Sequence, residues 1–186
     1  MSVRMRQAKR PVSAVLAGPY GHPIHPMLVT LPIGAWVTSL LFDVASHLVR
    51  HPAFLVMGSE WLIGVGVLGA VLAGMVGFLD LAVIPSGTPA FRTACAHMYV
   101  NLTLIFAYAG NFVWRYRTYV AGAPVRPAML AFSAVCVAAL FVSGYLGGKL
   151  AYCYGVRVAA EFTQAEGYIT ADDAIDTGRR APHRHA

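Results

Sequence analysis

Three histidines and one aspartate of this chain have side chains that could bind a metal ion or a metal-containing cofactor. His22 and His25 lie in a stretch rich in glycine and proline, residues 18–34, that runs directly into a long apolar segment. Asp80 lies near the end of a second apolar segment, and His97 lies near the start of a third. Imidazoles and carboxylates are common ligands of zinc, iron, copper and nickel. Imidazoles are also frequent axial ligands of haem iron.

The elements that must position these residues are membrane-spanning helices. Hydrophobic residues make up 58% of the 186 residues and charged residues only 12%, against about 25% charged residues in an ordinary soluble protein. The mean hydropathy is +0.60. Four apolar segments are each long enough to cross a hydrocarbon core of about 30 Å as a helix. We therefore predict an all-α integral membrane protein, a four-helix transmembrane bundle, with spans at about 27–49, 61–84, 94–114 and 128–152.

The distribution of positive charge predicts the orientation of this bundle. Ten of the 14 lysine and arginine residues precede the first span, lie between the second and third, or lie at or beyond the end of the fourth. Four lie on the opposite side: Arg50, Arg115, Arg117 and Arg126. The positive-inside rule then places both termini in the cytoplasm. The net charge of +6 is read as a topology signal, and the expected partner is the lipid bilayer rather than a nucleic acid.

Three regions are expected along the chain. Residues 1–21 read as a basic cytoplasmic leader without periodicity, and residues 22–158 as the four-span membrane domain. Residues 159–186 are polar, with few large apolar side chains, and are predicted to be a disordered cytoplasmic tail. The three cysteines form no CxxC pair and are expected to be free thiols: Cys95, Cys136 and Cys153.

The approach to the first span is predicted to be stiff and non-helical. Pro23 and Pro26 push the residues before them toward extended geometry. Pro26 itself suits the first turn of a helix. The first span is therefore expected to begin just after His25.

Topology brings the candidate ligands to one leaflet. His22 and His25 precede the first span, Asp80 lies shortly before the second ends, and His97 lies shortly after the third begins. At 1.5 Å per residue, Asp80 and His97 lie at a similar depth, roughly 7–9 Å below the cytoplasmic surface. A stripe of small residues lets the second span approach its neighbours and aims Asp80 into the bundle: Gly66, Ala70, Ala73 and Gly77.

Three interpretations of this constellation remain open. In the first, Asp80 pairs with His97, which has Asn101 one turn deeper on the same face, and the pair only fastens two spans together. In the second, His25 and His97 are axial ligands of a b-type haem, and Asp80 supports a ligand histidine or a haem propionate. The cofactor-binding residues are then His25, His97, Asp80 and Asn101. In the third, one divalent transition metal is bound by the set His22, His25, Asp80 and His97.

A second cluster of ionisable residues lies at the outer ends of the first two spans. Asp43 and His47 are four residues apart, and His51 and Glu60 follow in or near the outer loop. The favoured interpretation is a solvated ion pair at the membrane interface, which contributes little to stability.

Several motifs follow one another in a recognisable order. The segment 21–34 reads Gly-His-Pro-Ile-His-Pro-Met-Leu-Val-Thr-Leu-Pro-Ile-Gly. The motifs after it are Asp43, Gly77-Phe-Leu-Asp80, His97 with Asn101, and Gly147-Gly-Lys-Leu-Ala-Tyr152 followed by Gly155. Together, over roughly residues 18–158, they resemble an uncharacterised bacterial membrane family, domain of unknown function 2231. That family often has a histidine before its final glycine, where this chain has Tyr154.

The resemblance implies a multi-pass protein of the bacterial inner (cytoplasmic) membrane without an established activity. Some relatives are joined to Rieske-type iron–sulfur domains, which favours a redox role by association. The leading hypothesis is a small redox protein that binds haem b and exchanges electrons with a membrane partner such as a quinone, and that is not an enzyme on its own. The alternatives are a protein that binds, senses or transports a divalent transition metal, and a non-catalytic scaffold or assembly subunit.

Overall fold

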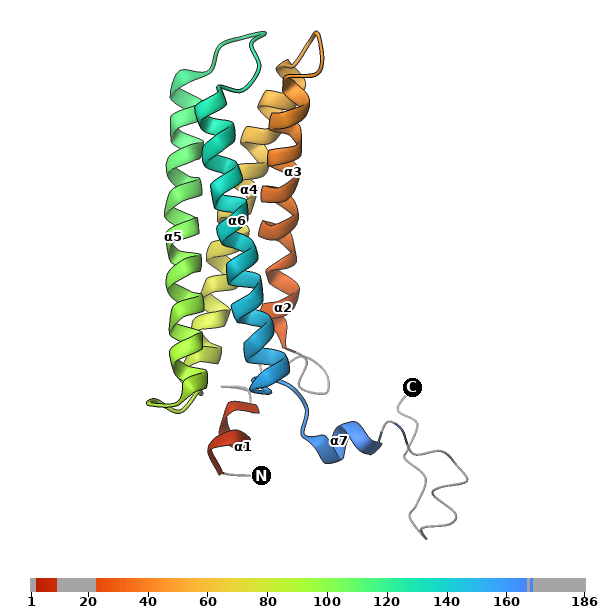
Figure 1. The fold of residues 1–186 in the computed structure, drawn as a ribbon, viewed down its shortest axis with the longest axis vertical. Coiled ribbons are helices and arrows are strands. Elements are labelled where there is room, and N and C mark those ends of the chain that lie inside the picture. The colour runs from red at the N-terminus through yellow and green to blue at the C-terminus, as the bar shows by residue number, and fades with distance from the viewer. Residues whose placement is uncertain (1–2, 10–22, 167, 169–186) are drawn as a thin grey trace.

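The computed structural model describes residues 3–9, 23–166 and 168, and all regular structure in these residues is helical. Four long helices pack side by side as an up-and-down bundle (Figure 1). They are α3 (Thr30–Ser46), α4 (Ala53–Ala82), α5 (Pro89–Thr118) and α6 (Pro127–Gly148). The short elements lie at one end of the bundle: α1 (Val3–Lys9), α2 (Ile24–Leu28), the π-helical turn η2 (Lys149–Cys153) and α7 (Glu161–Glu166).

Three helical segments of the described chain are long and apolar enough to cross a membrane. They are Ile24–Ser46, which joins α2 and α3, then Ala53–Ala82, and Pro127–Cys153. The fourth predicted span, 94–114, lies within α5, which is 30 residues long but is not among the three. Its buried Tyr108, Asn111 and Arg115 lower its average hydropathy.

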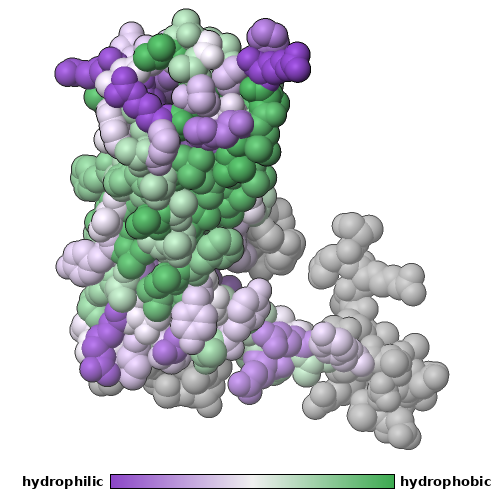
Figure 2. Space-filling view, turned by 45° about the horizontal axis from the view of Figure 1, so that its top comes forward, coloured by the Kyte–Doolittle hydropathy of each residue, from purple (hydrophilic) through white to green (hydrophobic). Residues whose placement is uncertain are grey.

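The surface of the bundle is apolar and its interior contains small and polar side chains. Large hydrophobic residues on the middle of the helices point outward, as in Leu68, Phe106 and Phe141, which are 69%, 74% and 71% exposed. Figure 2 shows hydrophobic residues along the middle of the bundle and hydrophilic residues gathered at its ends. A surface of this kind is stable in lipid, where apolar side chains have no reason to be buried. The protein is an integral membrane protein by this criterion.

The centre of the bundle is a small apolar core. Trp36 on α3 stacks on Tyr108 on α5 with ring centroids 4.1 Å apart and an interplanar angle of 13°. Ile63, Leu104 and Cys136 complete the cluster. Gly66 faces the Trp36 indole so closely that a Cβ atom there would clash with it. The small-residue stripe predicted for the second span is thus confirmed at this position.

The first span begins earlier than the prolines predict. Helix α2 begins at Ile24, so His25 is helical rather than extended, and Pro26 lies within the first turn as expected. The helix is interrupted at Val29 and resumes at Thr30. The predicted non-helical geometry at His25 is therefore wrong, since Pro26 lies in the first turn of α2, where its missing N–H leaves no helical hydrogen bond unmade.

The N-terminal segment also differs from the expected leader without periodicity. Residues Val3–Lys9 form α1, and Ala8 is buried there. The Ala8 carbonyl accepts a hydrogen bond from the Arg157 amide at 3.1 Å, and Lys9 Nζ donates to the Ala159 carbonyl at 3.0 Å. Helix α1 is therefore attached to the segment that follows η2.

Candidate functional site

His25 is held against α4 by one hydrogen bond and one glycine. Its Nδ1 lies 2.9 Å from the Ala73 carbonyl oxygen. A Cβ atom placed on Gly77 would lie 2.8 Å from His25 Cε1, so only glycine leaves room for the imidazole. The small-residue face of α4 thus positions a histidine that belongs to another helix.

His97 is held between α5 and α6 in the same manner. Its Nδ1 lies 2.9 Å from the Ser143 carbonyl oxygen, and a Cβ atom on Gly147 would lie 3.2 Å from His97 Cε1. Asn101, one turn along α5, donates from Nδ2 to the Ser143 hydroxyl at 2.7 Å and lies 3.2 Å from His97 Nε2. The predicted proximity of His97 and Asn101 is confirmed.

These contacts determine which ring nitrogen carries the proton. A carbonyl oxygen can only accept a hydrogen bond, so Nδ1 is the protonated nitrogen in both neutral imidazoles. Nε2 of His25 and Nε2 of His97 are then the lone-pair nitrogens. This Nδ1–H to carbonyl arrangement is the one that orients metal-binding histidines.

The two histidines lie next to each other although 72 residues of sequence separate them. Their ring centroids are 6.5 Å apart, and the ring planes are nearly perpendicular at 88°. Both residues lie in the half of the bundle that carries α1, α2 and η2. The predicted convergence of His25 and His97 is therefore what the structure shows.

Asp80 does not pair with His97. Its Oδ1 lies 3.0 Å from Nε of Arg157, and it remains within electrostatic range of His25. Arg157 reaches Asp80 because the chain turns back after η2, with Arg157 itself in the left-handed region at φ 58. The direct Asp80–His97 pair is thus a wrong prediction, since Asp80 pairs with the permanently charged Arg157 guanidinium, which attracts a carboxylate more strongly than a neutral imidazole does.

The four-residue metal set is only partly brought together. His22 lies outside the described residues. Among the residues that the structure describes, no group of three or more histidine, cysteine, aspartate and glutamate side chains could hold a metal ion. The described residues therefore supply a pair of imidazoles with a nearby, already paired carboxylate.

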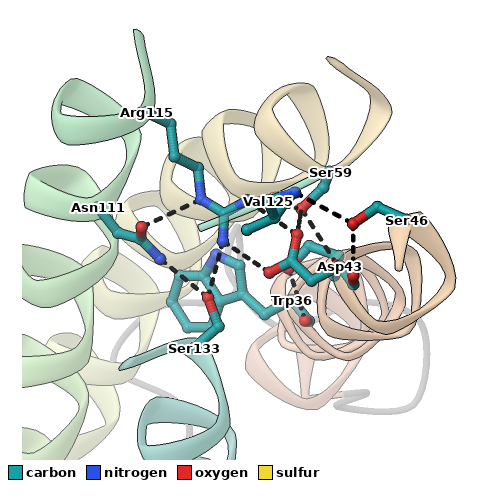
Figure 3. Close-up of polar contacts among 9 residues, drawn as sticks. Trp36, Asp43, Ser46, Ser59, Asn111, Arg115, Val125 and Ser133 are labelled. Carbon is teal, nitrogen blue, oxygen red and sulfur yellow. Dashed lines mark hydrogen bonds and ion pairs between the residues drawn. The ribbon is translucent and has the colours of Figure 1, made fainter. Parts of the chain in front are cut away.

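The other half of the bundle contains a buried ion pair that was not predicted (Figure 3). Asp43 on α3 and Arg115 on α5 form a two-pronged contact, with Nη1–Oδ1 at 2.8 Å and Nη2–Oδ2 at 2.6 Å. Their side chains are 0% and 4% exposed. The solvated Asp43–His47 interface pair is therefore a wrong prediction, because Asp43 faces the bundle interior while His47 is exposed.

All four long helices contribute to this ion-pair cluster. Ser59 on α4 donates to Asp43 Oδ1, and Ser133 on α6 accepts from Arg115 Nη2 at 3.1 Å. Asn111 accepts from Arg115 Nε at 3.1 Å and donates to Ser133 at 3.0 Å. Each charged group therefore has several partners, as a buried ion pair requires.

The sequence contained one signal for this cluster. Asn111 and Arg115 are four residues apart and so share one helical face, and Asp43 lies within an apolar span. The predicted third span ended at residue 114, which assigned Arg115 to the outer loop. The helix continues to Thr118, and this extra turn places the guanidinium inside the bundle.

A valine at Gly77 should displace the His25 ring, whereas a valine at Gly74 should not. Gly74 is on the same helix and has nothing within 4 Å of its Cβ position. The Gly77→Val protein should lose about 1–3 kcal/mol of stability to overpacking, measured by SDS titration in mixed micelles. Gly74→Val shares the cost of a β-branched helical residue and serves as the control. Equal stability of the two variants would contradict this packing.

Comparison with known proteins identifies one family, whose description agrees with a membrane protein. The sequence profile of a family described as a predicted membrane protein, domain of unknown function 2231 (DUF2231), matches residues 21–160. No curated protein and no solved structure matched the chain. The matched region includes both histidines, Asp80, and the whole Asp43–Arg115 cluster. The chain therefore belongs to the DUF2231 family of predicted membrane proteins.

Proposed function

We propose that this protein is a small membrane redox protein that binds haem b between His25 and His97. The observation that carries the proposal is the pair of neighbouring imidazoles, each with Nδ1 on a backbone carbonyl and with ring centroids 6.5 Å apart. Two histidines on different helices, each oriented by a backbone carbonyl, are a ligand pair that suits haem iron.

The spacing of the rings supports this ligand pair. Imidazole nitrogens bind metals at about 2.0–2.1 Å, so two imidazoles that share one metal would have to be close neighbours. The observed separation is 6.5 Å. Haem brings its own equatorial nitrogens and needs only two axial ligands from the protein, which is the number that the described helices bring together.

The residues of the chain have distinct parts in this proposal. The haem would supply a one-electron couple when bound. His25 and His97 would hold it through Nε2, which in His97 would have to release its contact with Asn101. The Ser143 carbonyl would keep the His97 ring in position through Nδ1. Asp80 and Arg157 form an ion pair beside His25 that would tune the site electrostatically or contact a propionate.

A divalent transition metal is the second candidate, because Asp80 lies within electrostatic range of His25. This site would use His25, His97 and Asp80 together with His22. Asp80 would then have to leave Arg157. A metal site should consequently weaken in Asp80→Asn, whereas axial ligation of haem should survive that change.

A scaffold is the third candidate. The ion-pair cluster joins all four long helices, which favours a role in holding the bundle together. Under this reading the histidines only fasten helices, and every variant at His25 or His97 would lack a bound ligand.

The proposal places the protein in a bacterial inner membrane with four spans and both termini in the cytoplasm. Helix α5 would be the fourth span, with its polar residues turned into the bundle. Removing the paired Arg115 and Arg157 from the charge count leaves the same positive-inside bias. A fluorescent protein fused after Ala186 should fluoresce, and an alkaline phosphatase fused there should be inactive. The reverse pattern would contradict the orientation.

The haem proposal is tested by an absorption spectrum of the detergent-purified protein, oxidised and reduced with dithionite, with metal analysis on the same sample. A near-stoichiometric Soret band that shifts on reduction is expected after expression with ample haem supply. No Soret band under those conditions would overturn the proposal. A stoichiometric bound metal would then favour the second candidate.

A further inference from the structure

A hollow with a volume of about 600 Å³ opens at the end of the bundle that holds the two histidines. It lies between α1, the last turns of α4, and the turn that leads into α5. Its walls include Gln7 of α1, Phe78 and Leu81 of α4, Ile84 and Ser86 of the turn, and Phe91 of α5. This volume falls in the range of about 300–1,000 Å³ that small-molecule sites occupy.

The lining of the hollow combines apolar side chains with a substantial share of polar surface, and two of its described side chains are neutral hydrogen-bonding groups. Phe78 and Phe91 supply aromatic rings, and Leu81 and Ile84 supply aliphatic surface. The amide of Gln7 and the hydroxyl of Ser86 are donors that can reach a bound acceptor. Among the residues that the structure describes, none of those lining the hollow carries a charge.

The position of the hollow connects it to the histidine pair. Phe78 directly follows Gly77, whose backbone packs against the His25 ring. Leu81 directly follows Asp80, the partner of Arg157. The wall of the hollow and the site of His25 are thus two faces of the same helical turns of α4.

We propose that this hollow binds the ring of a membrane quinone. A quinone is neutral, flat and apolar, with two carbonyl oxygens that accept hydrogen bonds, and these properties match the phenylalanine rings and the two donors. A phospholipid phosphate would require cationic partners, which the described lining residues do not supply. The exchange of electrons with this quinone rests on the proposed haem, whereas quinone binding itself does not.

The test uses a photoreactive azido derivative of a short-chain ubiquinone on the full-length protein in detergent. Mass spectrometry should map the label to the lining of the hollow, on α1, the end of α4 or the turn before α5. Excess unlabelled short-chain ubiquinone should remove the label, and excess phosphatidylglycerol should leave it.

Ala82→Trp should block the site, because Ala82 lines the hollow and is exposed. We expect labelling to fall at least tenfold. Leu72→Trp, on the outer surface of the same helix at 56% exposure, should label like the wild type. Gln7→Leu with Ser86→Ala should also weaken labelling without filling the hollow.

Label at other positions, equal labelling of Ala82→Trp and Leu72→Trp, or displacement by phosphatidylglycerol instead of ubiquinone would overturn the inference. The Soret band is recorded on the same samples. Labelling without a Soret band would overturn the haem and leave the quinone site, and a Soret band without labelling would do the opposite.

Discussion

Replacing Arg115 by alanine should lower the free energy of unfolding by about 3–5 kcal/mol, because it leaves the Asp43 carboxylate buried without its counter-ion. The carboxylate is fully buried, and Arg115 provides two of its contacts. The same change also removes hydrogen-bond partners from Asn111 and Ser133. SDS titration of the purified protein measures the loss.

Two further variants separate the ion pair from general effects at this end of α5. Arg117→Ala removes an exposed arginine two residues away and should change stability by less than about 0.5 kcal/mol. The double variant Asp43→Leu with Arg115→Met removes both charges and should recover much of the lost stability. If Arg115→Ala behaved like Arg117→Ala, the buried ion pair would have no role in holding the helices together.

Loss of either proposed ligand should abolish haem binding. His25→Ala and His97→Ala should each reduce the haem-to-protein ratio more than tenfold, since each removes one axial nitrogen and leaves a gap beside Gly77 or Gly147. The measurement is the Soret absorbance per protein after purification. His47→Ala removes an exposed histidine at the opposite end of the bundle and should keep the wild-type ratio.

A graded effect is expected from the residue that positions His97. Asn101→Ala keeps both imidazoles and frees His97 Nε2, but it removes the hydrogen bond to Ser143, the residue whose carbonyl holds His97 Nδ1. Removal of such a supporting partner typically costs 10–100-fold in ligand affinity, so haem should still bind but wash out during purification. Full retention in His97→Ala would show that this histidine is not a ligand.

The fold and the histidine pair could be predicted because strong local features of the sequence indicate them. Long apolar segments identify membrane helices without any tertiary information. Two spans lie between His25 and His97 along the chain, so the two residues lie at the same end of the bundle. Glycines at 77 and 147 mark where the helices approach the two rings, although only the structure shows which ring each glycine faces.

The two ion pairs could not be predicted because nothing local relates their members. Arg115 follows the apolar part of its span and therefore resembles a loop residue, and its partner Asp43 is on another helix. Arg157 lies beyond the last span, and it reaches Asp80 only because the chain turns back after the π-helical turn. Whether Arg115 and Arg157 reach their carboxylates depends on where a helix ends, and helix ends are the least certain feature of a sequence pattern.

The most direct test of the account is the near-infrared magnetic circular dichroism of the oxidised, haem-loaded protein, because the position of the charge-transfer band identifies both axial ligands. Ligation by His25 and His97 should give the spectrum of a six-coordinate, low-spin haem with two imidazole ligands. A five-coordinate high-spin spectrum, or one that indicates a histidine with a methionine or a thiolate, would contradict ligation by His25 and His97.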